Sequence, residues 1–125
     1  MLTGAQLRRH CLGLSGTTEE FPFRPGLSVF KVSGKVFALA HLKTKPLRVS
    51  LKCEPLLAEQ LRDTYAAITP GYHLNKRHWN TVELDGSVPD RLVLDMVEDS
   101  YDLVMDGLPK RVPGGGRSQS VAKRA

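Results

Sequence analysis

The sequence predicts an α+β protein, a two-layer sandwich in which helices pack on one face of an antiparallel sheet. Three observations predict this fold class. Several segments alternate apolar and polar residues as strands do, short turn signals separate some of them, and three segments carry apolar stripes at helical spacing. A chain of 125 residues is long enough to enclose one hydrophobic core.

The first two helical segments have clear beginnings. Residues 3–12 start with Thr3 and Gln6, which have the residue types and the spacing of a capping box. The second helix begins at Pro55, because proline suits the first turn, where its missing amide hydrogen costs nothing. The apolar stripe of this second helix is formed by Leu57, Leu61, Tyr65 and Ile68.

The third helix extends from a cap pair, Ser87 and Asp90, to about Met105, and Gly107 ends it. One side of this helix is apolar. The other side is acidic and is expected to be its solvated face, with weak binding of divalent ions or of a basic partner as the alternative. The acidic residues are Asp95, Glu98, Asp99, Asp102 and Asp106.

Residues 27–32 and 35–40 predict a β-hairpin, because a Ser-Gly turn joins two strand-like runs. The register of this hairpin places Phe30 opposite Phe37, an aromatic pair that would support one face of the sheet. The preceding residues, 21–26, are predicted to form a packed loop, since two closely spaced prolines exclude regular structure there.

Residues 47–52 and 79–84 predict two further strands, in which alternate apolar side chains suit the core. The other side chains of these strands then share the open face of the sheet with Lys31; they are Arg48, Ser50, Lys52, Trp79, Thr81 and Glu83. Basic and aromatic groups on a sheet face are typical of surfaces that bind single-stranded nucleic acid. The alternative is an ordinary solvated face with extended lysine stems.

Residues 71–80 gather polar and aromatic side chains between a Pro-Gly turn and a strand. The candidate binding residues in this segment are His73, Asn75, Lys76, Arg77, His78, Trp79 and Asn80. Lysine and asparagine can hold a phosphate while tryptophan stacks on a base. In the alternative interpretation Trp79 anchors the core, and the Asn and His side chains bond to the backbone of their own loop.

The net charge of +5 does not describe a basic domain. Five of the 18 Lys and Arg residues follow position 107 and no acidic residue does, so the remaining basic residues balance the 13 acidic ones. The sequence therefore predicts one domain over residues 1–111, followed by a basic tail at 112–125. The tail is rich in Gly and Ser and is expected to be disordered.

Other functional classes lack their sequence signals. No apolar run has the length of a membrane span and the first residues do not resemble a signal peptide, so we expect a cytoplasmic protein without a membrane partner. Cys11 and Cys53 are far apart and are expected to be free, buried thiols. Neither metal-ligand spacing, a nucleophile elbow nor a phosphate loop is present, so neither a cofactor nor enzymatic activity is predicted.

Five segments, taken together and in order, resemble the MmcQ/YjbR family of small bacterial proteins. These segments are 21–23, 30–37, 50–53, 70–80, and 100–104 with 108–110. The resemblance covers nearly the whole chain up to about Arg111. It implies an antiparallel sheet with helices on one side, similar to frataxin-like and secretion-chaperone-like folds, and a DNA-binding role. It brings no catalytic residues.

Two functional hypotheses follow from the sequence. The first is a nucleic-acid-binding module that uses the 71–80 segment and the basic open face, including Lys31, Arg48 and Lys52, and in which DNA is the partner. The second is a protein-interaction or small-ligand-binding module with no nucleic-acid role. In both cases we expect a monomer.

Overall fold

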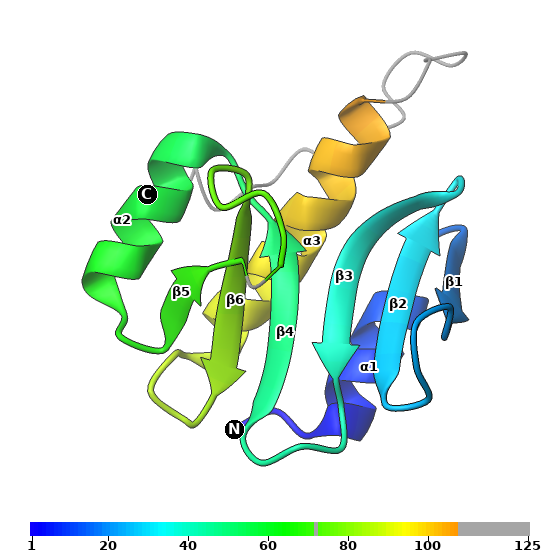
Figure 1. The fold of residues 1–125 in the computed structure, drawn as a ribbon, viewed down its shortest axis with the longest axis horizontal. Coiled ribbons are helices and arrows are strands. Elements are labelled where there is room, and N and C mark those ends of the chain that lie inside the picture. Colours follow the sequence, from blue (N-terminus) through cyan, green and yellow to red (C-terminus); the bar gives the residue numbers. More distant parts are fainter. Residues whose placement is uncertain (72, 108–125) are drawn as a thin grey trace.

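The computed structural model describes residues 1–71 and 73–107 and has the predicted α+β architecture. Its antiparallel sheet has six strands in the order β1-β2-β3-β4-β6-β5. Figure 1 views this sheet from its open side, with α1 and α3 behind it. The strands are β1 (Thr17–Glu20), β2 (Leu27–Val32), β3 (Lys35–His41), β4 (Leu47–Lys52), β5 (Ile68–Pro70) and β6 (Trp79–Leu84), and the helices are α1 (Gly4–Leu12), α2 (Pro55–Thr64) and α3 (Asp90–Asp106).

The hydrophobic core lies between the sheet and the helical layer. Strands β4 and β6 contribute Val49, Leu51 and Val82, whereas α1 and α3 contribute Leu7 and Val97. Each of these side chains is at most 1% exposed. Complete burial of one such side chain is worth about 1.5–3 kcal/mol, so this one-sided core fixes which face of each strand turns away from water.

The capping box predicted for α1 is confirmed. The amide of Gln6 donates to Thr3 Oγ1 at 3.1 Å, and the amide of Thr3 donates to Gln6 Oε1 at 2.9 Å. The cap pair predicted for α3 is wrong, because Ser87 donates both its amide and its hydroxyl to Asp85. Helix α3 therefore begins after Pro89 without a capping side chain.

Helix α3 is tied to the sheet through one buried hydroxyl group. Pairing between β3 and β4 extends only from Ala38–Leu51 to His41–Arg48. Beyond it, Ser100 Oγ accepts a hydrogen bond from the amide of Lys52 at 2.9 Å and donates one to the carbonyl of Phe37. Ser100 thus satisfies two backbone groups that the ladder leaves unpaired, and it does so at a position with no solvent exposure.

The predicted hairpin is present, but the predicted Phe30–Phe37 pair is wrong. Phe30 is opposite Ala38 and Lys31 is opposite Val36, so Phe37 is an additional residue in β3. Such a β-bulge shifts the register of one strand by one position. Both phenylalanines are nevertheless fully buried, and the Phe37 ring meets Tyr101 edge to face with centroids 5.4 Å apart.

Two edge strands, β1 and β5, were not predicted. Strand β1 consists of Thr and Glu residues without apolar alternation, and it is ordered by its pairing with β2. Strand β5 includes Ile68, which was assigned to the stripe of the second helix; α2 ends three residues earlier, at the extended residue Tyr65. Short strands of this kind depend on tertiary pairing more than on intrinsic propensity.

The residues after Gly107 lie outside the described part of the chain. The predicted domain end at residue 111 and the predicted basic tail at 112–125 both fall there. Within the described residues, every helix is too short or too polar to cross a membrane.

Cys11 and Cys53 are free, buried thiols, as predicted. Burial, assisted by Glu19, raises the pKa of Cys11 from 9.0 to about 12, and burial, with Asp99 second, does the same for Cys53. A thiol with a raised pKa stays protonated in the folded chain while the unfolded chain ionises. The free energy of unfolding is therefore unaffected below pH 9.0 and decreases between there and about 12.

We predict that each thiol lowers the free energy of unfolding by about 1.4 kcal/mol at about pH 10 relative to pH 8. Urea unfolding of the parent protein and of Cys11→Ala at both pH values measures this contribution. The variant should lose about 1.4 kcal/mol less than the parent protein on going to the higher pH. Equal losses in the two proteins would show that Cys11 ionises as readily in the folded state as in the unfolded one.

Candidate functional site

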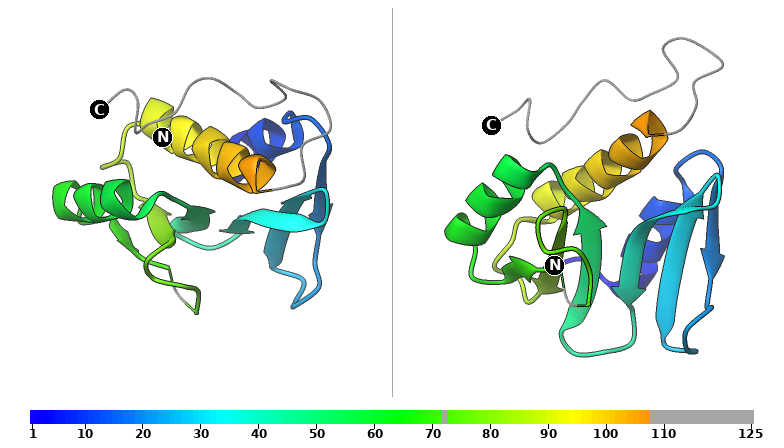
Figure 2. Two further views of the ribbon diagram at one scale, coloured as in Figure 1. Left: turned by 90° about the horizontal axis from the view of Figure 1, so that it is seen from above. Right: turned by 45° about the horizontal axis from the view of Figure 1, so that its top comes forward.

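The face of the sheet opposite the helices contains a groove of about 540 Å³, called here the open-face groove. Two loops form its walls: the β1–β2 loop (residues 21–26) and the described part of the β5–β6 loop (residues 71 and 73–78). The left view of Figure 2 shows both loops projecting from the side of the sheet opposite α1 and α3. The lining residues are Phe23, Arg24, Leu27, Leu39, His41, Arg48, Ser50, His73, Leu74 and Thr81.

Neighbouring strands place the floor of the groove in register. Ser50 of β4 is paired with Leu39 of β3 on one side and with Thr81 of β6 on the other. The hydroxyl oxygens of Ser50 and Thr81 are 2.8 Å apart and share a hydrogen bond. Two residues further along the same pair of strands, His41 is paired with Arg48. The predicted open-face positions of Arg48, Ser50 and Thr81 are therefore confirmed.

The groove is electropositive. Its lining includes two arginines and two histidines and no carboxylate. Among residues 1–71 and 73–107, no carboxylate forms an ion pair with Arg24 or Arg48, although the exposed Glu83 lies across the ladder from Arg48. The pKa of His41 is lowered, first by burial and then by Arg24 and Arg48. A concave lining with positive charge and no carboxylate is suited to an anion.

The β5–β6 loop is closed by bonds to its own backbone and to the neighbouring strand. The amide of Gly71 donates to the carbonyl of Trp79 at 2.8 Å, and a Cβ atom at Gly71 would lie only 2.7 Å from Trp79 Cβ. Glycine is required at this close approach. The Asn75 side chain accepts from the amide of Arg77, and the carbonyl of His78 accepts from the amide of Cys53 at 2.7 Å. The alternative interpretation, in which polar side chains of this segment bond to the backbone of their own loop, therefore holds for Asn75.

Asn80 was predicted to bind a ligand, and this prediction is wrong for its side chain. Asn80 has no solvent exposure because β6 turns it toward the helical layer. Its Nδ2 donates to the carbonyl of Ala58 at 3.3 Å, and its Oδ1 accepts from Arg62 at 3.0 Å. Arg62 also donates to the carbonyl of Lys76 at 2.9 Å, so these contacts fasten the loop to α2.

The remaining predicted binding residues do not form one cluster. Only Arg48 and His73 line the groove. Trp79 is half-buried, lies against Gly71 and is paired with Lys52, so it anchors the loop outside the groove. Lys31 forms an ion pair with Glu20 at 3.3 Å.

Two further predicted residues, Lys76 and Arg77, are exposed on the β5–β6 loop with Asn75, and His78 is half-buried there. Lys76 Nζ also donates to the carbonyl of Gly71 at 3.4 Å. These side chains lie on the loop that forms one wall, but they do not line the groove itself.

Among the lining residues missed from the sequence, three carry an aromatic or basic side chain. Phe23 is 69% exposed although its loop was predicted to be packed, and Arg24 follows it directly. His41 was not among the candidate residues named from the sequence. Its position opposite Arg48 was available only from the strand register, which depends on the length of the turn between β3 and β4.

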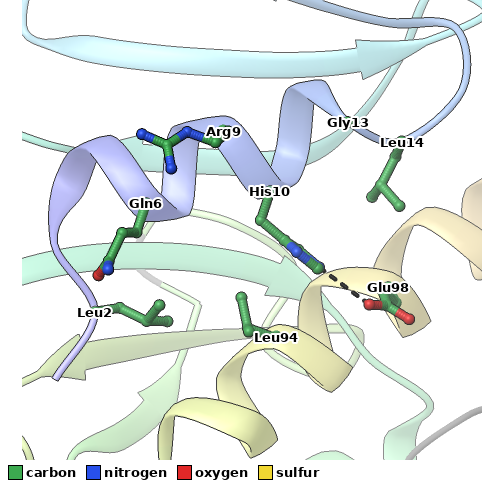
Figure 3. A pocket seen from close by; sticks show the side chains of 8 residues that line it. All are labelled: Leu2, Gln6, Arg9, His10, Gly13, Leu14, Leu94 and Glu98. Carbon is green, nitrogen blue, oxygen red and sulfur yellow. Dashed lines mark ion pairs between the residues drawn. The ribbon is translucent and has the colours of Figure 1, made fainter.

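A second hollow lies in the helical layer, between α1 and α3. Figure 3 shows His10 of α1 directed toward Glu98 of α3, and His10 Nε2 lies 3.1 Å from Glu98 Oε2. The pair joins two helices, and we assign it a structural role. The described residues contain no cluster of three His, Cys, Asp or Glu side chains suited to a metal ion.

Most of the acidic side of α3 is not solvated as predicted, although Asp106 at its end is exposed. Asp95, Asp99 and Asp102 are each 8% exposed. Asp95 pairs with Arg91 at 3.5 Å, and Asp99 is close enough to Cys53 to raise the pKa of that thiol. The periodicity of α3 therefore marks an acidic side but does not show whether that side reaches water.

The fold and the groove define a small α+β protein with a one-sided helical layer and an open sheet face framed by two loops. The YjbR family model matches residues 12–103, and the chain belongs to this family. The family resemblance noted from the sequence is thereby confirmed.

The relatives span most of this chain. It is 35% identical over 109 residues to the uncharacterised protein YjbR of Escherichia coli (strain K12), covering 87% of this chain and 92% of that protein. It is 34% identical to the uncharacterised protein YyaQ of Bacillus subtilis (strain 168), covering 82% and 98%. The crystal structure of protein DR2400 from Deinococcus radiodurans is similar with a TM-score of 0.81, 40% identity, and coverage of 94% and 97%.

We predict that Asn80→Ala lowers the free energy of unfolding by about 2 kcal/mol, because it removes the hydrogen bonds that this buried amide forms with Ala58 and Arg62. Arg77→Ala, on the same loop but exposed, should change it by less than about 0.5 kcal/mol. Urea denaturation of the two variants measures both values. Similar losses in the two variants would contradict the separation of this loop into a buried anchor and an exposed surface.

Proposed function

We propose that this protein binds single-stranded nucleic acid in the open-face groove, with phosphate groups held by arginine and bases placed against apolar and aromatic side chains. The observation that carries the proposal is the lining of the groove, which combines Arg24, Arg48 and Phe23 with no carboxylate. Positive charge beside aromatic side chains is the combination that single-stranded nucleic acids require.

The two arginines supply the phosphate contacts. Guanidinium groups bind phosphate oxygens through two parallel hydrogen bonds, and such charge-assisted bonds are roughly twice as strong as neutral ones. Neither Arg24 nor Arg48 has an ion-pair partner within the described residues, so an anion does not have to displace one. This favours the groove over Lys31, whose charge is offset by Glu20.

The β1–β2 loop supplies the stacking surface. Phe23 is 69% exposed and lines the groove, whereas Phe21, 53% exposed on the same loop, is not part of this lining. Single exposed apolar residues are common in soluble proteins, but an exposed phenylalanine next to an arginine is suited to hold a base. Leu27 and Leu39, on the floor of the groove, provide a further apolar surface for a base.

The opposite wall extends the path of a bound strand. Lys76 and Arg77 are exposed on the β5–β6 loop, where they can neutralise phosphates that lie beyond the groove.

The role proposed here is binding without a catalytic step. The second candidate is a small phosphorylated ligand, which the groove volume of about 540 Å³ favours because it is typical of small-molecule sites.

We predict that a fluorescently labelled oligothymidylate binds the parent protein and that its affinity decreases with salt, as counterion release requires. Arg48→Gln should weaken binding about tenfold and reduce the slope of the logarithmic salt dependence by about one. Phe23→Ala should weaken binding without changing that slope, because stacking releases no counterion. Fluorescence anisotropy over a salt series measures all three effects.

Lys35→Gln is the matched control, because it removes one positive charge from the exposed start of β3, far along the strand from His41. It should leave the affinity unchanged. If Arg48→Gln and Lys35→Gln weaken binding equally, the groove is not the site. If thymidine monophosphate binds as tightly as longer oligomers, the small-ligand candidate replaces strand binding.

A further inference from the structure

Three nitrogen-bearing side chains of the open-face groove come from three different segments. His41 is the last residue of β3, Arg48 is its partner on β4, and Arg24 belongs to the β1–β2 loop. All three line the groove. Side chains directly opposite each other on paired strands have Cβ atoms about 4.5–5.5 Å apart, so His41 and Arg48 can contact the same small anion.

This cluster is unfavourable without an anion. Both arginines act on His41 electrostatically and disfavour its protonated form. An anion placed between them removes that repulsion and accepts hydrogen bonds from the guanidinium groups and from a protonated imidazole. A phosphodiester carries one negative charge and several acceptor oxygens, which fits three convergent donors.

We infer that Arg24, His41 and Arg48 form a phosphate-binding subsite in which His41 takes up a proton from solvent as the anion binds, an inference that rests on the proposed function for its natural ligand. The direction in which pH changes the affinity follows from the pKa of His41 in the free protein and in the complex. In the free protein its pKa is lowered below 6.5, so the imidazole is mostly neutral at neutral pH.

In the complex the anion offsets the charge of the arginines, and the pKa of His41 is higher than in the free protein. Binding is then strongest at low pH and weakens as the pH rises through the pKa of the complex. For a histidine this window lies between about pH 5 and 8.

The groups that face His41 come from every wall of the groove. Arg24 and Arg48 lower its pKa, and His73 from the β5–β6 loop adds a second titratable ring to the lining. Glu83 lies opposite Arg48 on β6 and is exposed, and its negative charge opposes that of the arginine. Leu27, the partner of His41 on β2, is apolar.

The test uses two probes whose own charge is constant over the window, oligothymidylate and inorganic sulfate. Oligothymidylate should bind about tenfold more tightly at about pH 5.5 than at about pH 8. His41→Gln, which retains a polar side chain but cannot be protonated, should abolish this dependence. His73→Asn, chosen because asparagine tolerates the positive φ of 58° at this position, should retain it.

An NMR titration of the imidazole signals gives an independent readout. Sulfate should raise the pKa of His41 in the parent protein, and Arg24→Gln or Arg48→Gln should raise it without any ligand. If His41→Gln retains the pH dependence, or if sulfate leaves the pKa of His41 unchanged, the subsite is refuted even where oligothymidylate binds. If sulfate acts at His41 but oligothymidylate does not bind, the subsite stands and the proposed nucleic-acid function fails.

Discussion

The alternation of side chains along β4 is the constraint on which the rest of the structure depends. β4 is paired with β3 on one side and with β6 on the other, so each of its side chains has a fixed face. Val49 and Leu51 enter the core beneath the helices, whereas Arg48 and Ser50 line the open-face groove. A slip of one residue would bury Arg48 and expose the apolar side chains, which is strongly unfavourable. Core burial therefore determines the chemistry of the groove.

The positive character of the groove is a local property of the fold. The chain before residue 108 carries equal numbers of acidic and basic residues, yet the loops and strands place Arg24 and Arg48 in one lining that contains no carboxylate. Six of the 13 acidic residues lie on α3, on the other side of the sheet. Buried polar contacts hold the frame: Ser100 joins α3 to β3 and β4, and Asn80 joins β6 to α2. A rigid frame of this kind positions the two loops that form the walls of the groove.

Much of the fold could be predicted from the sequence, because core positions repeat with the period of their element. The faces of Arg48 and Ser50 followed from the apolar alternation of β4, and α1 followed from its capping box. The bulge at Phe37 and the edge strand β1 could not be predicted, since both depend on tertiary pairing. The site was predicted less well than the fold. Arg24 and His41 become functional candidates only through segments that are distant in sequence, and nothing local marks them.

We propose that an anionic ligand binds in the open-face groove. Two-dimensional amide NMR spectra recorded during a titration with oligothymidylate test this binding most directly. Binding in the groove should shift the amide signals of Leu39, Ser50 and Thr81, which form its floor, progressively, together with signals from the β1–β2 loop. Shifts confined to residues after Gly107, with the floor signals unchanged, would contradict it.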